Sequence, residues 1–223
     1  MPAKGDSVGA EELHLSASIS EMEIISHEDS IFVFNGLPAR QYEIHAIVGE
    51  IPFTLTMIVV EEVNTHPYIE KMEVSFSSAW KWELEPLKRL VETNREPTML
   101  LIGLRSYCNE MQYRRCVWKW MKQKWDRNVV LQYGEYSNAV FVCTDGLLTP
   151  SEKPKFLLSW SISFSPEGVA APSIYPHFSM ECSDEDAKEE YDELHSEMIK
   201  SFTSLLEVRG VESAISFLMS CIL

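Results

Sequence analysis

The chain has 223 residues, of which 45% are hydrophobic, so it can build a folded core and is not a disordered segment. Its 34 acidic and 19 basic residues give a net charge of −15, which disfavours a protein whose main task is to bind the phosphates of a DNA duplex. No apolar run is long enough for a membrane span, and the five scattered cysteines are typical of a reducing compartment.

The first part of the chain predicts a polar leader followed by a domain rich in strands. We expect the leader at residues 1–18 and the first domain at residues 19–96. Period-two alternation and β-branched residues predict strands, which turn residues such as Asn35 and Gly36 separate. The predicted strands are 21–26, 31–34, 41–48, 53–60 and 68–76. Residues 83–93 then predict a short helix, which ends before Pro97.

The second domain, residues 97–223, predicts a helix, four strands and two further helices. Apolar residues recur at helical spacing over 98–125, with one face formed by Leu104, Tyr107, Cys108, Met111, Trp118, Met121 and Trp125. Strands are expected at 129–133, 139–143, 156–164 and 173–180, and the third alternates large apolar residues (Phe156, Leu158, Trp160, Ile162, Phe164) with smaller or polar ones.

Two helices are expected at the C-terminal end of the sequence. Ser183 can cap the first helix, whose apolar stripe is Tyr191, Leu194, Met198, Phe202 and Leu205. Gly210 breaks it, and the second helix carries the stripe Val211, Ala214, Ile215, Leu218 and Ile222. The order of elements predicts an α+β protein of two small units, each an antiparallel sheet with helices packed on one face.

No sequence motif indicates an enzyme. The sequence lacks the glycine-rich motifs of nucleotide-binding loops, the G-x-S-x-G motif of hydrolases and the H-E-x-x-H motif of zinc proteases. The six histidines never fall at metal-ligand spacing. We therefore expect no catalytic residues, no metal, no cofactor and no small-molecule substrate. Cys116 follows two arginines, which leaves a reactive thiolate open as an alternative to a cysteine at the edge of the core.

A basic band interrupts the acidic chain. Residues 105–127 hold 7 basic and 2 acidic residues, net +5, whereas 1–99 (7 basic, 17 acidic) and 128–223 (5 basic, 15 acidic) are each net −10. Trp118, Trp120 and Trp125 lie among these cations. Three interpretations remain open: contact with nucleic acid through charge and stacking, docking onto an acidic protein surface, or a core helix whose solvent side is basic.

Two places are candidate sites for a partner protein. One is the central helix, where the candidate residues are Arg114, Arg115, Trp118 and Lys122. The other is the set of exposed strand edges in the first domain, because an unpaired edge can accept a further strand.

Several stretches, taken in order, resemble one known family. The end of the chain carries a Phe-x-x-Leu … Gly-Val-Glu-x-Ala pattern, formed by Phe202, Leu205, Gly210, Val211, Glu212 and Ala214. Two stretches precede this pattern in the order that the family has. They are residues 98–124, with Arg105-Ser106 and Tyr113-Arg114-Arg115, and residues 156–169, with Ser159-Trp160-Ser161-Ile162. Residues 53–91 resemble the family more weakly. Over roughly residues 50–223 the chain resembles the centromere protein P family of the inner kinetochore.

This resemblance implies a fold, a partner and a location. It implies two tandem RWD domains and a non-enzymatic scaffold in the nucleus, at the centromere and kinetochore, that contributes to chromosome segregation. Its expected partners are a second tandem-RWD subunit like centromere protein O and other inner kinetochore subunits, with no membrane and no direct DNA contact. Conjugating-enzyme activity is not expected, because His66-Pro67 is followed by Tyr68 and no cysteine comes before Cys108. The alternative is an RWD adaptor in a ubiquitin, repair or signalling complex elsewhere.

Overall fold

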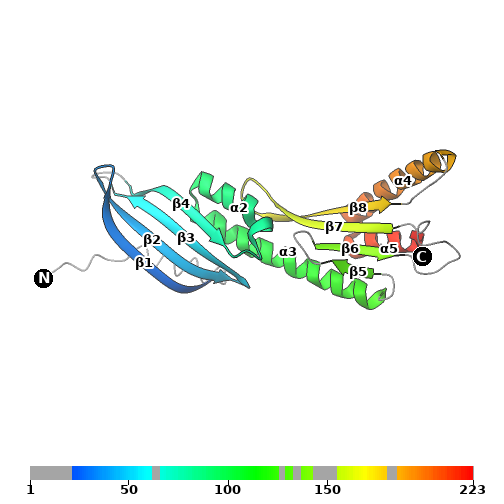
Figure 1. Ribbon diagram of the computed structural model, residues 1–223, viewed down its shortest axis with the longest axis horizontal. Coiled ribbons are helices and arrows are strands. Elements are labelled where there is room, and N and C mark those ends of the chain that lie inside the picture. The colour runs from blue at the N-terminus through cyan, green and yellow to red at the C-terminus, as the bar shows by residue number, and fades with distance from the viewer. Residues whose placement is uncertain are drawn as a thin grey trace. The chain divides into compact units, whose positions relative to one another are not determined.

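The chain is a mixed α+β protein, and contacts within it define two units. The computed structural model describes residues 22–61, 66–125, 129–132, 137–142, 155–179 and 185–222, so the expected leader and the cap at Ser183 lie outside the described residues. Unit 1 comprises residues 1–111 and 162–171, and unit 2 comprises residues 112–161 and 172–223. Figure 1 labels the elements of both units.

The sheet of unit 1 is a four-stranded antiparallel meander. Its strands are β1 (Met22–Phe34), β2 (Leu37–Val48), β3 (Ile51–Val60) and β4 (Tyr68–Phe76), in that order across the sheet. The prediction of separate strands at 21–26 and 31–34 was wrong, because β1 is continuous. Its polar residues 27–30 pair one by one with β2, and a register shift between Ile24 and Ser26 absorbs the irregularity.

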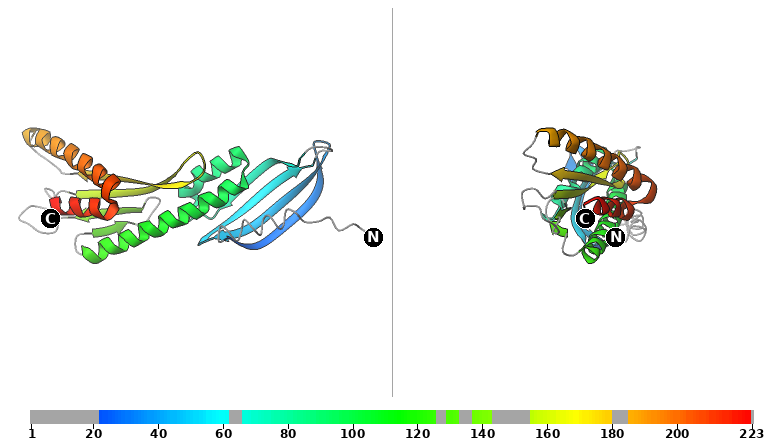
Figure 2. Two further views of the ribbon diagram at one scale, coloured as in Figure 1. Left: turned by 180° about the vertical axis from the view of Figure 1, so that it is seen from behind. Right: turned by 90° about the vertical axis from the view of Figure 1, so that its right-hand side faces the viewer.

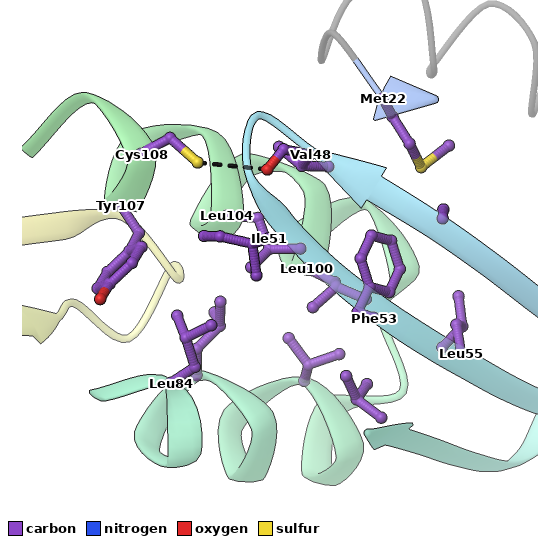
Figure 3. Close-up of a cluster of buried hydrophobic side chains, with 14 of the residues drawn as sticks. Met22, Val48, Ile51, Phe53, Leu55, Leu84, Leu100, Leu104, Tyr107 and Cys108 are labelled. Atoms are coloured by element: carbon purple, nitrogen blue, oxygen red, sulfur yellow. Dashed lines mark hydrogen bonds between the residues drawn. The ribbon is translucent and has the colours of Figure 1, made fainter. Parts of the chain in front are cut away.

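Helices cover one face of this sheet and form the core of unit 1. Figure 3 shows Leu84 of α2 (Lys81–Asn94) and Leu100 and Leu104 of α3 (Pro97–Lys124) directed toward the sheet. They belong to one core cluster with four alternating residues of β3, which are Ile51, Phe53, Leu55 and Met57. The opposite face is more polar, as the contact between His45 Nδ1 and Thr54 Oγ1 (3.0 Å) illustrates. The alternation of the strands therefore sets which face receives the helices.

A hairpin from the second half of the chain completes unit 1. Residues 162–171 are the end of β7 (Lys155–Phe164), the turn, and the start of β8 (Ala170–Ser179). The Tyr107 ring stacks on Phe164 with centroids 6.1 Å apart, and the Ala170 N–H donates to Ser106 Oγ at 2.8 Å. The expected division at residues 96 and 97 therefore differs from the grouping in the structure, where the first half of α3 belongs to unit 1.

Unit 2 is built on strands β5 (Val129–Gln132), β6 (Ser137–Val142), β7 and β8, which form a second sheet in that order. The pairs β5–β6 and β6–β7 are antiparallel. Helices α4 (Glu185–Arg209) and α5 (Val211–Ile222) follow and form a V in Figure 2. As predicted, the core includes Leu158 and Trp160 of β7, Phe202 of α4, and the α5 stripe Val211, Ala214, Ile215 and Leu218.

Candidate interaction surface

The second half of α3 has a buried face and an exposed basic face. Its buried residues recur at helical spacing and are Arg114, Val117, Trp118 and Met121. Arg115, Lys119 and Lys122 are exposed and follow one another at steps of four and three residues, which places them on one side of the helix. We call these three residues the basic stripe. The structure therefore separates Arg114 and Trp118 from the other two candidate residues, Arg115 and Lys122.

Arg114 and Trp118 belong to the core of unit 2. Arg114 is only 5% exposed, and its Nη1 donates to the backbone carbonyl of Trp160 at 3.1 Å. The ring of Trp118, 3% exposed, meets the Trp160 ring edge to face with centroids 5.3 Å apart. A buried guanidinium needs such a hydrogen-bond acceptor, and aromatic rings prefer this T-shaped geometry. Both side chains thus join α3 to β7.

Two further residues of the band join α3 to α5. The Tyr113 hydroxyl donates to Glu212 Oε2 at 3.2 Å, and Lys124 Nζ donates to Ser216 Oγ at 3.2 Å. The sequence did not predict either role, because the partners lie 99 and 92 residues away along the chain. A local pattern contains no signal for pairs so far apart.

The remaining tryptophans of the band are also engaged within unit 2. Trp120 and Trp125 meet edge to face at 5.2 Å, and Lys124 Nζ lies 5.1 and 4.4 Å from their ring centroids, a cation–π arrangement. Both rings are half-buried. A nucleobase needs a free aromatic face to stack on, so these contacts disfavour the interpretation that the band binds nucleic acid by stacking.

The basic stripe is exposed on α3, and the sequence from residue 111 to residue 125 contains no acidic residue. Such a surface favours an acidic partner, and exposed arginine at an interface is a frequent anchor.

Metal-ligating side chains do not gather in the part of the chain that the structure describes. There they form no group of three or more, and no described helix is long and apolar enough to cross a membrane. Cys108 is buried, with its thiol 3.5 Å from the Val48 carbonyl oxygen, while Cys116 is exposed.

Three described carboxyl groups have shifted pKa values, and none of the shifts comes from another carboxyl group. A hydrogen bond and the charge of Lys71 lower the pKa of Glu73, and hydrogen bonds from Ser165 and the backbone lower that of Glu167. Burial raises the pKa of Glu110.

A comparison with protein families gives one match. Residues 41–219 match the family described as CENP-A-nucleosome distal (CAD) centromere subunit, CENP-P. The match begins inside β2, so strand β1 precedes it. A comparison with curated protein sequences gave no match.

Proposed function

The chain belongs to the CENP-P family of centromere subunits and is a structural, non-enzymatic component of the kinetochore, and we propose that it acts there by pairing with a second tandem-RWD subunit, centromere protein O. Family membership decides against the alternative, an adaptor that works away from centromeres. The observation that carries the proposal is the family match over residues 41–219, which spans both units.

We propose further that both units are RWD-like domains. Unit 2 supports this with a helix, four strands and two helices in succession, formed by α3, β5–β8, α4 and α5. Unit 1 supports it with a four-stranded antiparallel meander followed by α2 and covered on one face by helices. Two small sheet-and-helix units suit a scaffold, because each presents strand edges and helix faces to other subunits.

Co-expression tests the pairing. The full chain and centromere protein O, produced together with an affinity tag on only one of them, should elute as one complex in gel filtration. Matched co-expression with an unrelated acidic protein should give separate elution. Separate elution of the chain and centromere protein O, with both folded, would contradict the pairing.

The basic stripe is our proposed contact with an acidic surface in the assembly. Its cations project from the exposed side of α3, while Arg114 and Trp118 on the buried side hold that helix in unit 2. A fixed helix presents its charges in a fixed arrangement, which favours specific recognition.

Charge reversal tests this surface. In Arg115→Glu/Lys122→Glu we expect the affinity for the partner subunit to fall about tenfold or more, since like charges now face each other. The matched control is Lys200→Glu/Arg209→Glu, at two exposed positions on α4 of the same unit, which should keep the affinity. Equal losses in both variants would show that net charge, and not the basic stripe, controls binding.

A further inference from the structure

Strand β1 is the edge of the sheet in the part of unit 1 that the structure describes, and it carries large exposed apolar side chains. Among the described residues β1 pairs only with β2, and it is 13 residues long. Ile31 and Val33 near its end are each 72% exposed, and Ile25 is 60% exposed. Long exposed edges of this kind are templates for pairing with another chain. We call residues 22–34, viewed from the side away from β2, the β1 edge.

The opposite edge of the same sheet is protected. On β4 the Val74 N–H donates to Glu92 Oε1 at 2.7 Å, and Arg95 Nη1 donates to the Ile69 carbonyl at 3.4 Å. The side chains of Glu92 in α2 and of Arg95 after it thus already bond backbone groups of β4 that an added strand would need. Glu73 and Lys71 also place charges on that strand, 2.7 Å apart. Proteins block sheet edges in this way to prevent pairing with another strand. The β4 edge is therefore closed to an added strand, in contrast to the β1 edge.

The charge of the β1 edge restricts its occupant. The strand contains three carboxylates, Glu23, Glu28 and Asp29, and no lysine or arginine. None of the three forms an ion pair with another described residue, and the nearby Arg40 is paired with Glu61 at 3.1 Å. A strand laid against this edge therefore meets acidic groups in its middle and apolar groups at its end.

We propose that the β1 edge binds an extended segment of a partner protein by strand addition, with apolar side chains beside Ile31 and Val33 and lysine or arginine beside Glu28 and Asp29. Backbone hydrogen bonds would supply much of the affinity, and the alternating side chains would supply the specificity. Opposite charges on neighbouring strands stabilise the pair, and like charges destabilise it. This proposal rests on the edge alone and does not depend on the pairing with centromere protein O.

A second copy of the chain is a poorer occupant. Antiparallel self-pairing centred on the strand would bring Glu28 of one copy against Glu28 of the other, with the two Asp29 residues at adjacent positions. That arrangement sets like charges opposite each other, which costs stability. The observed composition of β1 therefore favours a basic partner segment over a homodimer.

A peptide-binding experiment on the full chain tests the proposal. The probe is a synthetic peptide in which a run of valines is joined to two adjacent lysines, and its counterpart replaces the lysines with glutamates. We expect the lysine peptide to bind and to slow hydrogen exchange of the β1 amides, and the glutamate peptide to bind at least about tenfold more weakly. Ile31→Lys/Val33→Lys should weaken binding about tenfold or more, because it places like charge on the edge.

Two variants make the result decisive. Ser204→Lys/Val208→Lys adds the same two charges at exposed positions of α4 and should leave binding unchanged. Glu28→Lys/Asp29→Lys should reverse the preference, so that the glutamate peptide binds better, and this holds as a test even if Ile31→Lys/Val33→Lys fails to fold. The proposal would be overturned if the lysine peptide does not bind, if both peptides bind equally, or if hydrogen exchange slows outside β1 instead. It would also be overturned by a homodimer that Ile31→Lys/Val33→Lys abolishes.

Discussion

Replacing Arg114 should destabilise unit 2, although this residue lies in a cationic stretch that looks like surface. Arg114 is 5% exposed, and its guanidinium donates to the Trp160 carbonyl. We expect Arg114→Ala to unfold at clearly lower denaturant concentration. Arg115→Ala, the neighbouring position on the exposed side, should unfold as the original chain does.

The size of the effect follows from the contact. A hydrogen bond from a charged donor contributes about 1.5–3 kcal/mol, and truncation also removes the packed aliphatic stem of Arg114. We therefore expect Arg114→Ala to lower the free energy of unfolding by about 2–3 kcal/mol. Exposed substitutions such as Arg115→Ala usually stay within about 0.5 kcal/mol. Arg114→Lys keeps the charge but not the planar donor group, so we expect an intermediate loss.

Urea denaturation followed by tryptophan fluorescence is the suitable assay. Four of the six tryptophans (Trp118, Trp120, Trp125 and Trp160) lie in unit 2, so the signal reports mainly on that unit. Each variant's midpoint and slope should be compared, because a change in slope indicates a change in cooperativity. A neutral Arg114→Ala, or an Arg115→Ala that destabilises equally, would refute the assignment of Arg114 to the core.

Three further substitutions test the core of unit 1. Gly103→Ala would place a Cβ 2.4 Å from Leu87 Cδ1, so we expect overpacking to lower stability by about 1–3 kcal/mol in a urea titration. Burial raises the pKa of the Glu110 carboxyl, so the ionised carboxylate lowers the stability of the fold above the raised pKa, and this cost disappears as the pH falls. Glu110→Gln should therefore raise the melting temperature at neutral pH. The gain should shrink as the pH is lowered toward 4.5, the ordinary pKa of the carboxyl group. Tyr107→Phe removes the hydroxyl that donates to Glu83 Oε2 and should cost about 1.5–3 kcal/mol, measured by circular dichroism.

Local patterns predicted most elements and much of the core. The alternation of β7 and the stripe of α5 predicted burial of Trp160 and Ile215, because a period of 2 or 3.6 residues directly encodes which side meets the core. The burial of Cys108 and Met121 on α3 was predicted in the same way. These predictions needed no knowledge of distant partners.

Features that depend on distant contacts could not be predicted. The charge of Arg114 predicted an exposed side chain. Arg114 lies in the core because its guanidinium bonds the carbonyl of Trp160, which is 46 residues away along the chain. The hairpin 162–171 belongs to unit 1 through contacts with Ser106 and Tyr107, which no local pattern reveals. Strand β1 was divided in the prediction because residues 27–30 are polar, whereas an exposed edge strand needs no apolar residues at that point.

The dependence of centromere localisation on centromere protein O tests the proposed pairing. A fluorescently tagged full chain should form foci at centromeres, and rapid depletion of centromere protein O should disperse them, because we propose that the chain takes its place through that pairing. Foci that keep their intensity after centromere protein O has been removed would contradict the proposed pairing.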